Sequence, residues 1–339
     1  MTRRLGTLVV GAVLLVALAV GGSLLPVPYV ALGPGPTFNT LGSIDGRKVI
    51  EVTGRDTNPS TGNLNLTTVS VRDRLELLRA VEGWIDPQES VVPREEVYPP
   101  DQTSQQVDAA NRQDFINSQN SAEAAALTKL GFPMKVVVVD VPKGSPSAGV
   151  LQPEDAIESL NGTSITDSKS LLAALTALDP GSVVTVGYHR LGKPGSGAIT
   201  TTKADGRDGA ALGISVSYER KAPFTVNINV ANVGGPSAGL MLTLGILDLV
   251  GSTDLVDGRV VAGTGTISSD GMVGPIGGVR LKIIAAHELG AVVFLTPKSN
   301  CAEALQNAPA GLPLASVGTL DDALTALADL REGRTPPLC

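Results

Sequence analysis

The sequence predicts an α+β fold that follows an N-terminal transmembrane helix. Three observations predict it: a long uncharged apolar run at the N-terminus, short β-branched runs bounded by glycine and proline, and apolar segments with helical periodicity. Hydrophobic residues make up 42% of the 339 residues and charged residues 17%, so the chain can bury a sizeable core and is not disordered as a whole. At ~150 residues per domain, this length corresponds to about two domains.

The N-terminal run extends from Leu5 to Leu25 without a charge and follows Arg3 and Arg4. As a helix it reaches roughly 30 Å, the thickness of the hydrocarbon core of a bilayer. Because the positive charges precede it, we expect a single-pass protein of the cell membrane, with a cytoplasmic N-terminus and the bulk of the chain outside. A cleaved signal peptide, with Ala17-Leu18-Ala19 as cleavage site, is the alternative. The run is longer than the ~7–15 apolar residues of such peptides, which favours an uncleaved anchor.

Charge and residue counts restrict the chemistry. The net charge of −7 gives no support for a surface that binds nucleic acid, so we expect no nucleic-acid partner. The sequence has two histidines, two cysteines, and neither HExxH nor CxxC spacing, so we expect no metal site and no cofactor. Outside the cytoplasm Cys301 and Cys339 would form a disulfide that holds the C-terminal tail, and two free thiols are the alternative.

The segment before residue 130 contains both strands and helices. Residues 26–45 are rich in proline and glycine and form an extended exit from the membrane. Val49–Thr53 and Leu64–Val71 are predicted strands. Apolar positions at helical spacing predict a helix over Arg72–Ile85, and a second helix over Ser104–Leu130 is polar at first and then rich in alanine.

A second pattern begins near Lys135. The β-branched run Val136–Val141 is followed by the turn Gly144-Ser145-Pro146 and then by Ile157–Gly162. A helix and a closing strand come next, over Ser168–Leu178 and Val183–His189. This order of elements resembles a bacterial PDZ domain over roughly residues 130–205.

The PDZ resemblance implies that an extended peptide is bound as an added strand at a sheet edge. Leu130-Gly131-Phe132 is similar to the carboxylate-binding loop of that family, where glycine lets backbone N–H groups face an anion. The alternative is that Gly131 only caps the preceding helix. Glu154 stands where the family pattern has glycine, so the turn there differs.

The tetrapeptide Pro-Ser-Ala-Gly occurs at 146–149 and again at 236–239. Ser147 lies in the turn of the PDZ-like segment, where small residues serve the turn and no chemistry follows. Ser237 follows a predicted strand and the turn Gly234-Gly235, and it opens the apolar helix Ala238–Val250. Such a turn exposes a hydroxyl beside backbone N–H groups that can receive an oxyanion. A helix N-cap is the alternative role for this serine.

A candidate base follows the second of these serines. A predicted strand over Val260–Gly263 leads to a glycine-rich segment and a helix that begins near Val279. This helix carries Lys282 among apolar neighbours, and desolvation together with the nearby helix N-terminus lowers a lysine pKa, so that a neutral amine is available as a base. A serine paired with a lysine needs no histidine. A serine–histidine pair with His287 is the alternative.

The sequence TGTI…GMVGPIGGVRLKIIAAH, together with PSAG, resembles the proteolytic domain of the Lon family over roughly residues 206–320. The resemblance implies that the catalytic serine is Ser237 and the catalytic lysine Lys282. The motif threonine falls on Thr264, whose hydroxyl would orient the amine, and Gly235 and Pro236 form the supporting turn. Two family acidic residues are absent, because the loop before the serine reads Val-Gly-Gly and the second motif reads Thr-Gly-Thr-Ile. Arg280, at another family lysine position, is too near the helix surface to be the base.

The sequence has no GxxxxGK[ST] motif, so we expect no ATPase module. A transmembrane helix and a PDZ domain in its place resemble the bacterial membrane-anchored PDZ–Lon-like proteases. This resemblance implies that the strands before the PDZ domain complete the protease fold. The expected segments are the tip and transmembrane helix (1–30), the N-terminal part of the protease (31–129), the PDZ domain (130–205) and the Lon-like domain (206–339).

The expected activity is hydrolysis of peptide bonds through an acyl-enzyme, without ATP, in unfolded or flexible proteins. The expected partners are protein or peptide substrates and membrane lipid. The Lon resemblance also implies a homo-oligomer, with a hexamer as the model. The competing function is a non-enzymatic PDZ adaptor on a protease-like scaffold, which predicts loss of Ser237 or Lys282, and both are present.

Overall fold

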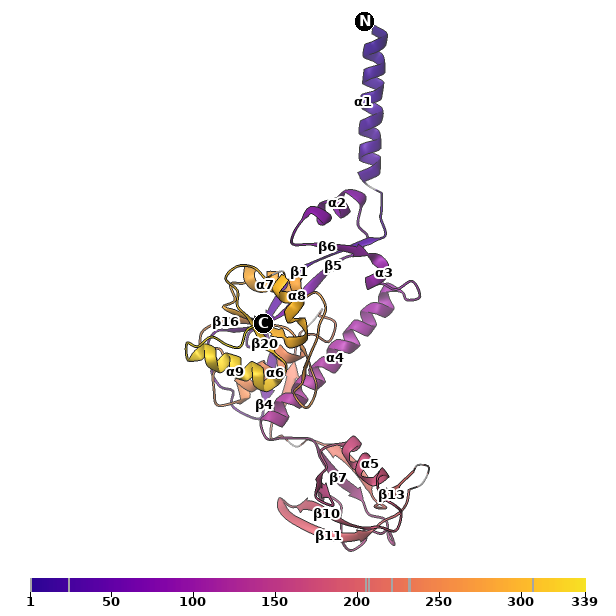
Figure 1. Ribbon diagram of the computed structural model, residues 1–339, viewed down its shortest axis with the longest axis vertical. Coiled ribbons are helices and arrows are strands. Elements are labelled where there is room, and N and C mark those ends of the chain that lie inside the picture. Colours follow the sequence, from indigo (N-terminus) through magenta and orange to yellow (C-terminus); the bar gives the residue numbers. More distant parts are fainter. Residues whose placement is uncertain are drawn as a thin grey trace. The chain divides into compact units, whose positions relative to one another are not determined.

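The computed structural model describes residues 2–23, 25–204, 206, 208–220, 222–230, 233–306 and 308–339. They belong to two compact units, of which the first combines residues 1–126 with 224–339 and the second comprises residues 127–223. The second unit is therefore an insertion in the sequence of the first (Figure 1).

The N-terminal helix α1 (Thr2–Ser23) is the one helix in the described ranges that is long and apolar enough to cross a membrane. Its span Leu5–Ser23 has a mean hydropathy of 2.4, and nothing in the structure buries it. The helix covers most of the uncharged run Leu5–Leu25. Pro26 and Pro28 follow the run, and proline does not continue a helix.

The first unit is built on a mixed sheet whose strands come from both ends of the chain. The N-terminal strands β1 and β5 are antiparallel to each other, and β5 runs parallel to β16, so it joins the two parts of the unit. β16, β19 and β20 are parallel neighbours, and β6 lies at the other edge beside β1. In spatial order the strands are β20 (Leu314–Val317), β19 (Val293–Pro297), β16 (Val260–Gly263), β5 (Asn63–Arg72), β1 (Tyr29–Asn39) and β6 (Ser90–Pro93).

Two helices cover opposite faces of this sheet. Ala262 of β16 belongs to the core cluster that also contains Val279 and Ile283 of α7 (Val279–Glu288). A Cβ on the next residue, Gly263, would meet Met241 of α6 (Gly239–Val250) at 2.7 Å. Because successive side chains of a strand point to opposite faces, α6 and α7 pack on opposite sides. The unit ends with η1 (Lys298–Asn300), α8 (Cys301–Gln306) and α9 (Leu320–Arg331).

The remaining elements of the first unit are short hairpins and helices. β4 pairs with β15 and β17 with β18, both antiparallel. The sequence predicted a helix from Arg72, but α2 begins at Leu77 because β5 continues to Arg72 and Arg74 then has a left-handed φ of 59°. The elements are β2 (Ser43–Ile44), β3 (Arg47–Lys48), β4 (Ile50–Thr53), α2 (Leu77–Ile85), α3 (Arg94–Val97), α4 (Ser104–Lys129), β15 (Thr225–Ile228), β17 (Thr266–Ile267) and β18 (Val273–Gly274).

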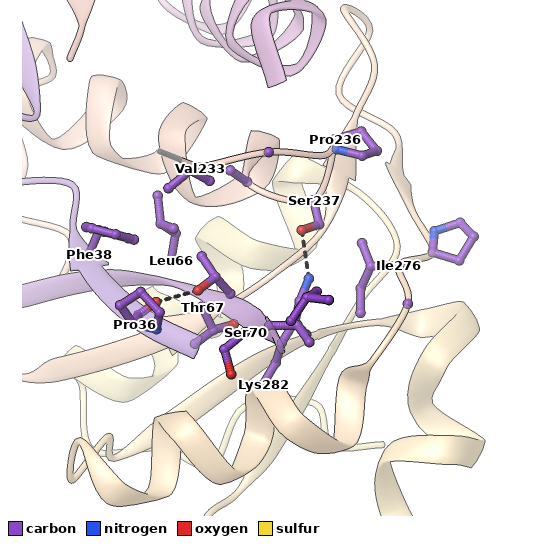
Figure 2. A pocket seen from close by; sticks show the side chains of 17 residues that line it. Pro36, Phe38, Leu66, Thr67, Ser70, Val233, Pro236, Ser237, Ile276 and Lys282 are labelled. Atoms are coloured by element: carbon purple, nitrogen blue, oxygen red, sulfur yellow. Dashed lines mark hydrogen bonds between the residues drawn. The ribbon is translucent and has the colours of Figure 1, made fainter. Parts of the chain in front are cut away.

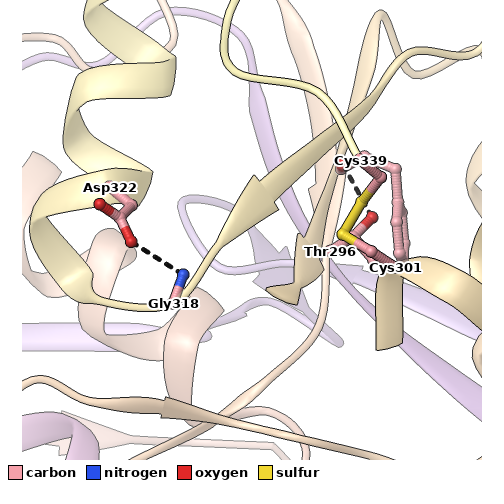
Figure 3. Close-up of a disulfide and its surroundings, with 6 residues drawn as sticks. Thr296, Cys301, Gly318, Asp322 and Cys339 are labelled. Carbon is pink, nitrogen blue, oxygen red and sulfur yellow. Dashed lines mark hydrogen bonds between the residues drawn. A yellow bond between two sulfur atoms is a disulfide. The ribbon is translucent and has the colours of Figure 1, made fainter. Parts of the chain in front are cut away.

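A disulfide joins Cys301, at the start of α8, to Cys339 in the C-terminal tail (Figure 3). The Cys339 N–H also donates a hydrogen bond of 2.9 Å to the Leu314 carbonyl of β20. Figure 3 also shows Asp322 of α9 accepting from the Gly318 N–H at 2.9 Å, next to the capping box that Asp322 forms with Thr319. The disulfide and the hydrogen bond from Cys339 hold the C-terminal tail at the edge of the sheet. Of the two alternatives for the cysteines, the structure has the disulfide.

The second unit contains a small antiparallel sheet that is covered by the helix α5 (Ser168–Thr176). The main path of the sheet is β11-β10-β8-β7-β14, and its core consists of aliphatic side chains such as Val138, Leu171 and Val186. Its strands are β7 (Lys135–Asp140), β8 (Ala156–Leu160), β9 (Thr163–Ser164), β10 (Val183–Arg190), β11 (Lys193–Thr200), β12 (Thr202–Lys203), β13 (Ala210–Ala211) and β14 (Ser215–Glu219).

Candidate active site

Ser237 lies in the tight turn that leads into α6. Gly235 in this turn has a left-handed φ of 81°, a conformation that glycine adopts without strain. Two contacts from α4 hold the turn in place: the Asn111 carbonyl accepts from the Gly235 N–H at 2.8 Å, and the Ser118 hydroxyl donates to the Pro236 carbonyl at 2.9 Å. These contacts could not be predicted from the sequence, because nothing in α4 indicates which turn it meets.

Lys282 reaches the same place from α7. Gly278 precedes this helix with a left-handed φ of 66°, and a Cβ there would lie 2.9 Å from Val69 of β5, so glycine sets how closely the helix approaches the sheet. The Lys282 amine lies 2.7 Å from the Ser237 Oγ and 3.1 Å from the Thr264 Oγ1. Figure 2 shows the serine oxygen and the lysine nitrogen pointing toward each other.

Burial determines the charge of Lys282. Its side chain is only 3% exposed, and this desolvation lowers the pKa of the amine from 10.5 to about 8. The hydrogen-bond partners of the amine in the described part of the chain are hydroxyl groups, which do not compensate the charge of the ammonium form. An amine with this pKa is partly neutral near physiological pH and can then accept the proton of the serine hydroxyl.

Thr264 connects the serine and the lysine. It is fully buried at the end of β16, donates to the Ser237 carbonyl at 3.1 Å, and accepts from the Lys282 amine at 3.1 Å. The next residue, Gly265, also donates to the Ser237 carbonyl, at 2.9 Å, and its own carbonyl accepts from Leu240 of α6 at 3.1 Å. The start of α6 is therefore held directly at the carboxyl end of β16.

The Ser237–Lys282 pair opens into a groove of about 770 Å³. The turn before α6 and the segment before α7 form two sides of the groove, and N-terminal strands form the rest (Figure 2). The sequence led us to expect that the strands before the PDZ domain complete the protease fold, but it did not indicate which of their residues would line the groove. Their lining residues are Pro36, Phe38, Leu66, Thr67, Thr68, Val69, Ser70 and Val71.

Comparison with known proteins gives two matches along the chain. Residues 226–327 match the model of the Lon protease (S16) C-terminal proteolytic domain, and residues 106–201 match that of the PDZ domain. The chain carries a Lon-type proteolytic domain and a PDZ domain. The matches and the mixed helices and strands confirm the predicted α+β fold.

The relatives named Lon protease are similar to the chain over part of its length. The Lon protease of Haemophilus influenzae is 34% identical over 119 residues, which cover 33% of this chain and 14% of that protein. The Lon protease of Campylobacter concisus is 37% identical over 94 residues, which cover 26% of this chain and 11% of that protein. The chain therefore spans only a small part of the length of these relatives.

Among solved structures, the PDZ domain of the SdrC-like protein from Listeria monocytogenes matches 24% of this chain and 85% of that chain. The sequence identity is 25% and the TM-score 0.23.

The structure gives Gly131 the role of a helix cap rather than that of a peptide loop. Gly131 has a φ of 87° and donates to the Thr128 carbonyl at 3.1 Å, directly after the end of α4. The strand that follows, β7, pairs with β8 on one side and with β14 on the other, so it offers no open edge to a peptide. Of the two roles that the sequence left open for Leu130–Phe132, the structure supports the helix cap.

A second groove, which was not predicted from the sequence, lies between β14 and α5. This cavity of about 550 Å³ is lined by Leu171, Leu172 and Leu175 of α5 and by residues 211–216. β14 is the last strand on the sheet path, and Leu212-Gly213-Ile214 directly precedes it. A hydrophobic–glycine–hydrophobic triplet before a strand was the signal that could have indicated this groove.

The other candidate residues have different surroundings. His287 is an exposed residue near the end of α7, and no hydrogen bond is found between it and Ser237 in the described part of the chain. Arg280 contacts the start of β6, where it donates to the Glu89 carbonyl and to the Ser90 hydroxyl, both at 2.7 Å. Ser147 is fully buried and donates to the Leu212 carbonyl, so its role is structural.

Proposed function

We propose that the chain is a serine endopeptidase that uses Ser237 as nucleophile and Lys282 as general base. The observation that supports this most directly is the 2.7 Å contact between the Lys282 amine and the Ser237 Oγ, combined with the burial that lowers the lysine pKa. A buried lysine without a carboxylate partner costs stability, so a fold that retains one beside a serine gains something other than stability.

The proposed mechanism has two steps. Neutral Lys282 accepts the Ser237 proton while the Oγ attacks the substrate carbonyl, and the resulting ammonium then protonates the leaving amine. The acyl-enzyme is hydrolysed by water that the same amine activates. The N–H groups of Ser237 and Ala238 at the start of α6 would stabilise the oxyanion, because the first turn of a helix leaves such donors without intrahelical partners. In a known protease each oxyanion donor contributes about 2.7–4 kcal/mol to transition-state stabilisation.

Thr264 is proposed as a positioning residue. Its hydroxyl holds both the backbone of the nucleophile and the amine of the base. Gly235 and Pro236 support it by fixing the turn.

The natural substrates would be unfolded or flexible protein segments. The sequence carries no phosphate-binding GxxxxGK[ST] motif, and for this reason we propose that hydrolysis proceeds without ATP. Without an ATP-driven unfolding step, only a chain that is already extended can enter the groove between β5 and the Ser237 turn. The PDZ domain would select such chains by adding a peptide strand to β14 beside the apolar side chains of α5.

The proposed location is the cell membrane, with α1 as a single anchor and both compact units outside the cytoplasm. The apolar length of α1 and the two arginines before it support this location and orientation. The Cys301–Cys339 disulfide agrees with an oxidising compartment. Assembly as a homo-oligomer, with a hexamer as the model, stays a prediction.

The test is degradation of a labelled unfolded protein by the full chain in detergent micelles without ATP. We expect cleavage by the natural chain and loss of cleavage in Ser237→Ala and in Lys282→Ala. Lys298→Ala, an exposed lysine of the same unit, is the matched control and should keep activity. His287→Ala addresses the serine–histidine alternative: activity in Lys282→Ala together with inactivity in His287→Ala would establish it. Binding of unfolded chains by a natural chain that cleaves none would favour the PDZ adaptor.

A further inference from the structure

The helix α2 carries an apolar stripe that no other described part of the chain covers. Its members recur at helical spacing on one face, with Trp84 55% and Ile85 78% exposed. The helical periodicity of this segment ordinarily predicts a buried face, but here the same positions face outward. The stripe consists of Leu77, Leu78, Val81, Trp84 and Ile85.

The stripe cannot turn inward, because α2 is docked through its small residues. Ala80 and Gly83 are the buried positions of the helix. A Cβ on Gly83 would lie 2.7 Å from the side chains of both Glu89 and Val91, so the helix backbone lies directly against β6 and the loop before it. Rotation that buried Trp84 would have to place its ring where no Cβ fits.

The polar edge of α2 is neutralised by pairs within the same region. Arg79 pairs with Glu82 and lies 4.0 Å from Glu89, and Arg72 lies 3.0 Å from Glu89. A surface that binds this helix would therefore gain mainly from burying apolar area, and little from opposite charge.

Backbone hydrogen bonds hold the first turn of α2 at the end of the apolar N-terminal run. The Leu77 N–H donates to the Leu25 carbonyl at 2.9 Å, and the Val27 N–H donates to the Leu75 carbonyl at 2.9 Å. Pro26 and Glu76 form a bridge between these two bonds. If α1 spans the bilayer, α2 therefore begins at the level where the hydrocarbon ends. Figure 1 shows α2 next to the C-terminal end of α1.

The aromatic side chains at this level have the chemistry of a membrane boundary. The rings of Trp84 and Tyr29 meet edge to face, with centroids 5.4 Å apart. Tryptophan and tyrosine are enriched where lipid headgroups meet acyl chains, since their rings are apolar and their N–H and O–H groups remain hydrated.

We infer that α2 is an interfacial helix whose apolar stripe lies in the bilayer surface beside α1, and that its ligand is the lipid itself. This inference rests on the proposed membrane anchor. A helix with an apolar face of this kind lies in the membrane plane at the boundary of headgroups and acyl chains. The second attachment point fixes the β6 edge of the sheet against the membrane, so the folded part of the first unit keeps one orientation to the bilayer.

The chain offers an internal probe, because Trp84 is its one tryptophan. The full chain is reconstituted in vesicles of phosphatidylcholine and phosphatidylglycerol, and flotation establishes whether it is anchored. Replacing the phosphatidylcholine with a form brominated on its acyl chains should then quench about half of the Trp84 emission, because the ring lies within roughly 5–10 Å of the boundary. Pure phosphatidylcholine vesicles should give the same quenching, since charge contributes little.

The matched control moves the probe to an equally exposed site. In Trp84→Phe with Leu305→Trp, the tryptophan lies on α8, where Leu305 is 55% exposed, and brominated lipid should leave its emission unchanged. In Leu78→Ser with Ile85→Ser, Trp84 remains but the stripe is weakened, so flotation should persist while quenching falls.

The outcomes separate the inference from the anchor on which it rests. A chain that does not float refutes the anchor. A chain that floats with Trp84 unquenched by brominated lipid and open to aqueous iodide refutes the interfacial helix alone. Shielding from iodide without lipid quenching, rising with protein concentration, would assign the stripe to a second copy of the chain and also overturn the inference.

Discussion

The pH dependence of peptide hydrolysis is the sharpest consequence of the buried lysine. With a pKa of about 8, Lys282 is neutral in roughly one molecule of ten at pH 7 and in roughly nine of ten at pH 9. We therefore expect kcat/KM to rise about tenfold between these values and to level off above pH 9. With an ordinary lysine pKa of 10.5, the neutral fraction at pH 7 would be about 300-fold smaller and kcat/KM would still climb at pH 9.

The assay is initial-rate cleavage of a quenched-fluorescent unfolded substrate by the full chain in detergent, from pH 6 to pH 10. His287→Ala is the control. It should keep the same midpoint, because this side chain is exposed and takes no part in the proposed mechanism. A midpoint near 6.5, the ordinary pKa of histidine, would refute the assignment of the base. A profile that rises without a plateau to pH 10 would refute the argument from burial.

The same lysine also affects stability, and the sign can be worked out. Because folding lowers the lysine pKa from 10.5 to about 8, the folded state binds fewer protons than the unfolded state between these values. Stability therefore falls as the pH drops from about 10.5 to about 8, in total by roughly 3 kcal/mol, and stays constant below. Lys282→Met removes this cost, so chemical denaturation at pH 7 should show a gain of that order. A loss of stability in Lys282→Met would contradict the reasoning.

Three further predictions concern the supports of the site. Thr264→Val should lower kcat/KM about tenfold and move the pH midpoint below 8, because the amine loses an acceptor that stabilises its charged form; an unchanged profile would refute the positioning role. Gly278→Ala should cost about 1–2 kcal/mol in thermal unfolding from its left-handed backbone alone, whereas Gly277→Ala, with open space around it, should cost less. Cys301→Ser with Cys339→Ser should lower the free energy of unfolding by up to about 4 kcal/mol, since the bond closes a loop with a sequence separation of 38; equal denaturation midpoints with and without the bond would contradict this.

Local sequence patterns predicted the parts of the fold that depend on near neighbours in the chain. The apolar run became α1, and the strand predicted over Leu64–Val71 became β5 with one added residue at each end. Ser237 and Lys282, predicted as a pair from a motif resemblance, lie in hydrogen-bond contact. Both follow from residues whose backbone requirements are local, namely a glycine turn and a helix start.

The parts that could not be predicted depend on packing between distant segments. The periodicity around Leu78 indicates a helix face but does not say whether protein or another medium covers it. Gly131 fits both a helix cap and an anion-binding loop, and only the pairing of β7 on both sides decides between them. The contacts from Asn111 and Ser118 to the serine turn carry no sequence signal, because any backbone carbonyl or hydroxyl in that place would serve.

The candidate site is complete only when both ends of the first unit have folded together. Ser237, Thr264 and Lys282 come from the C-terminal part, whereas the contacts from α4 to the serine turn and the β5 wall of the groove come from the N-terminal part. The residues that line this groove in the described part of the chain all belong to the first unit. The selection that we propose for the PDZ domain and the cleavage that we propose for the pair would therefore rest on separate cores. A substitution in the β14 groove should then change KM for tagged substrates while kcat for short peptides stays constant. Because the two units have separate cores, residues 127–223 can be inserted in the middle of the first unit's sequence without changing how that unit packs.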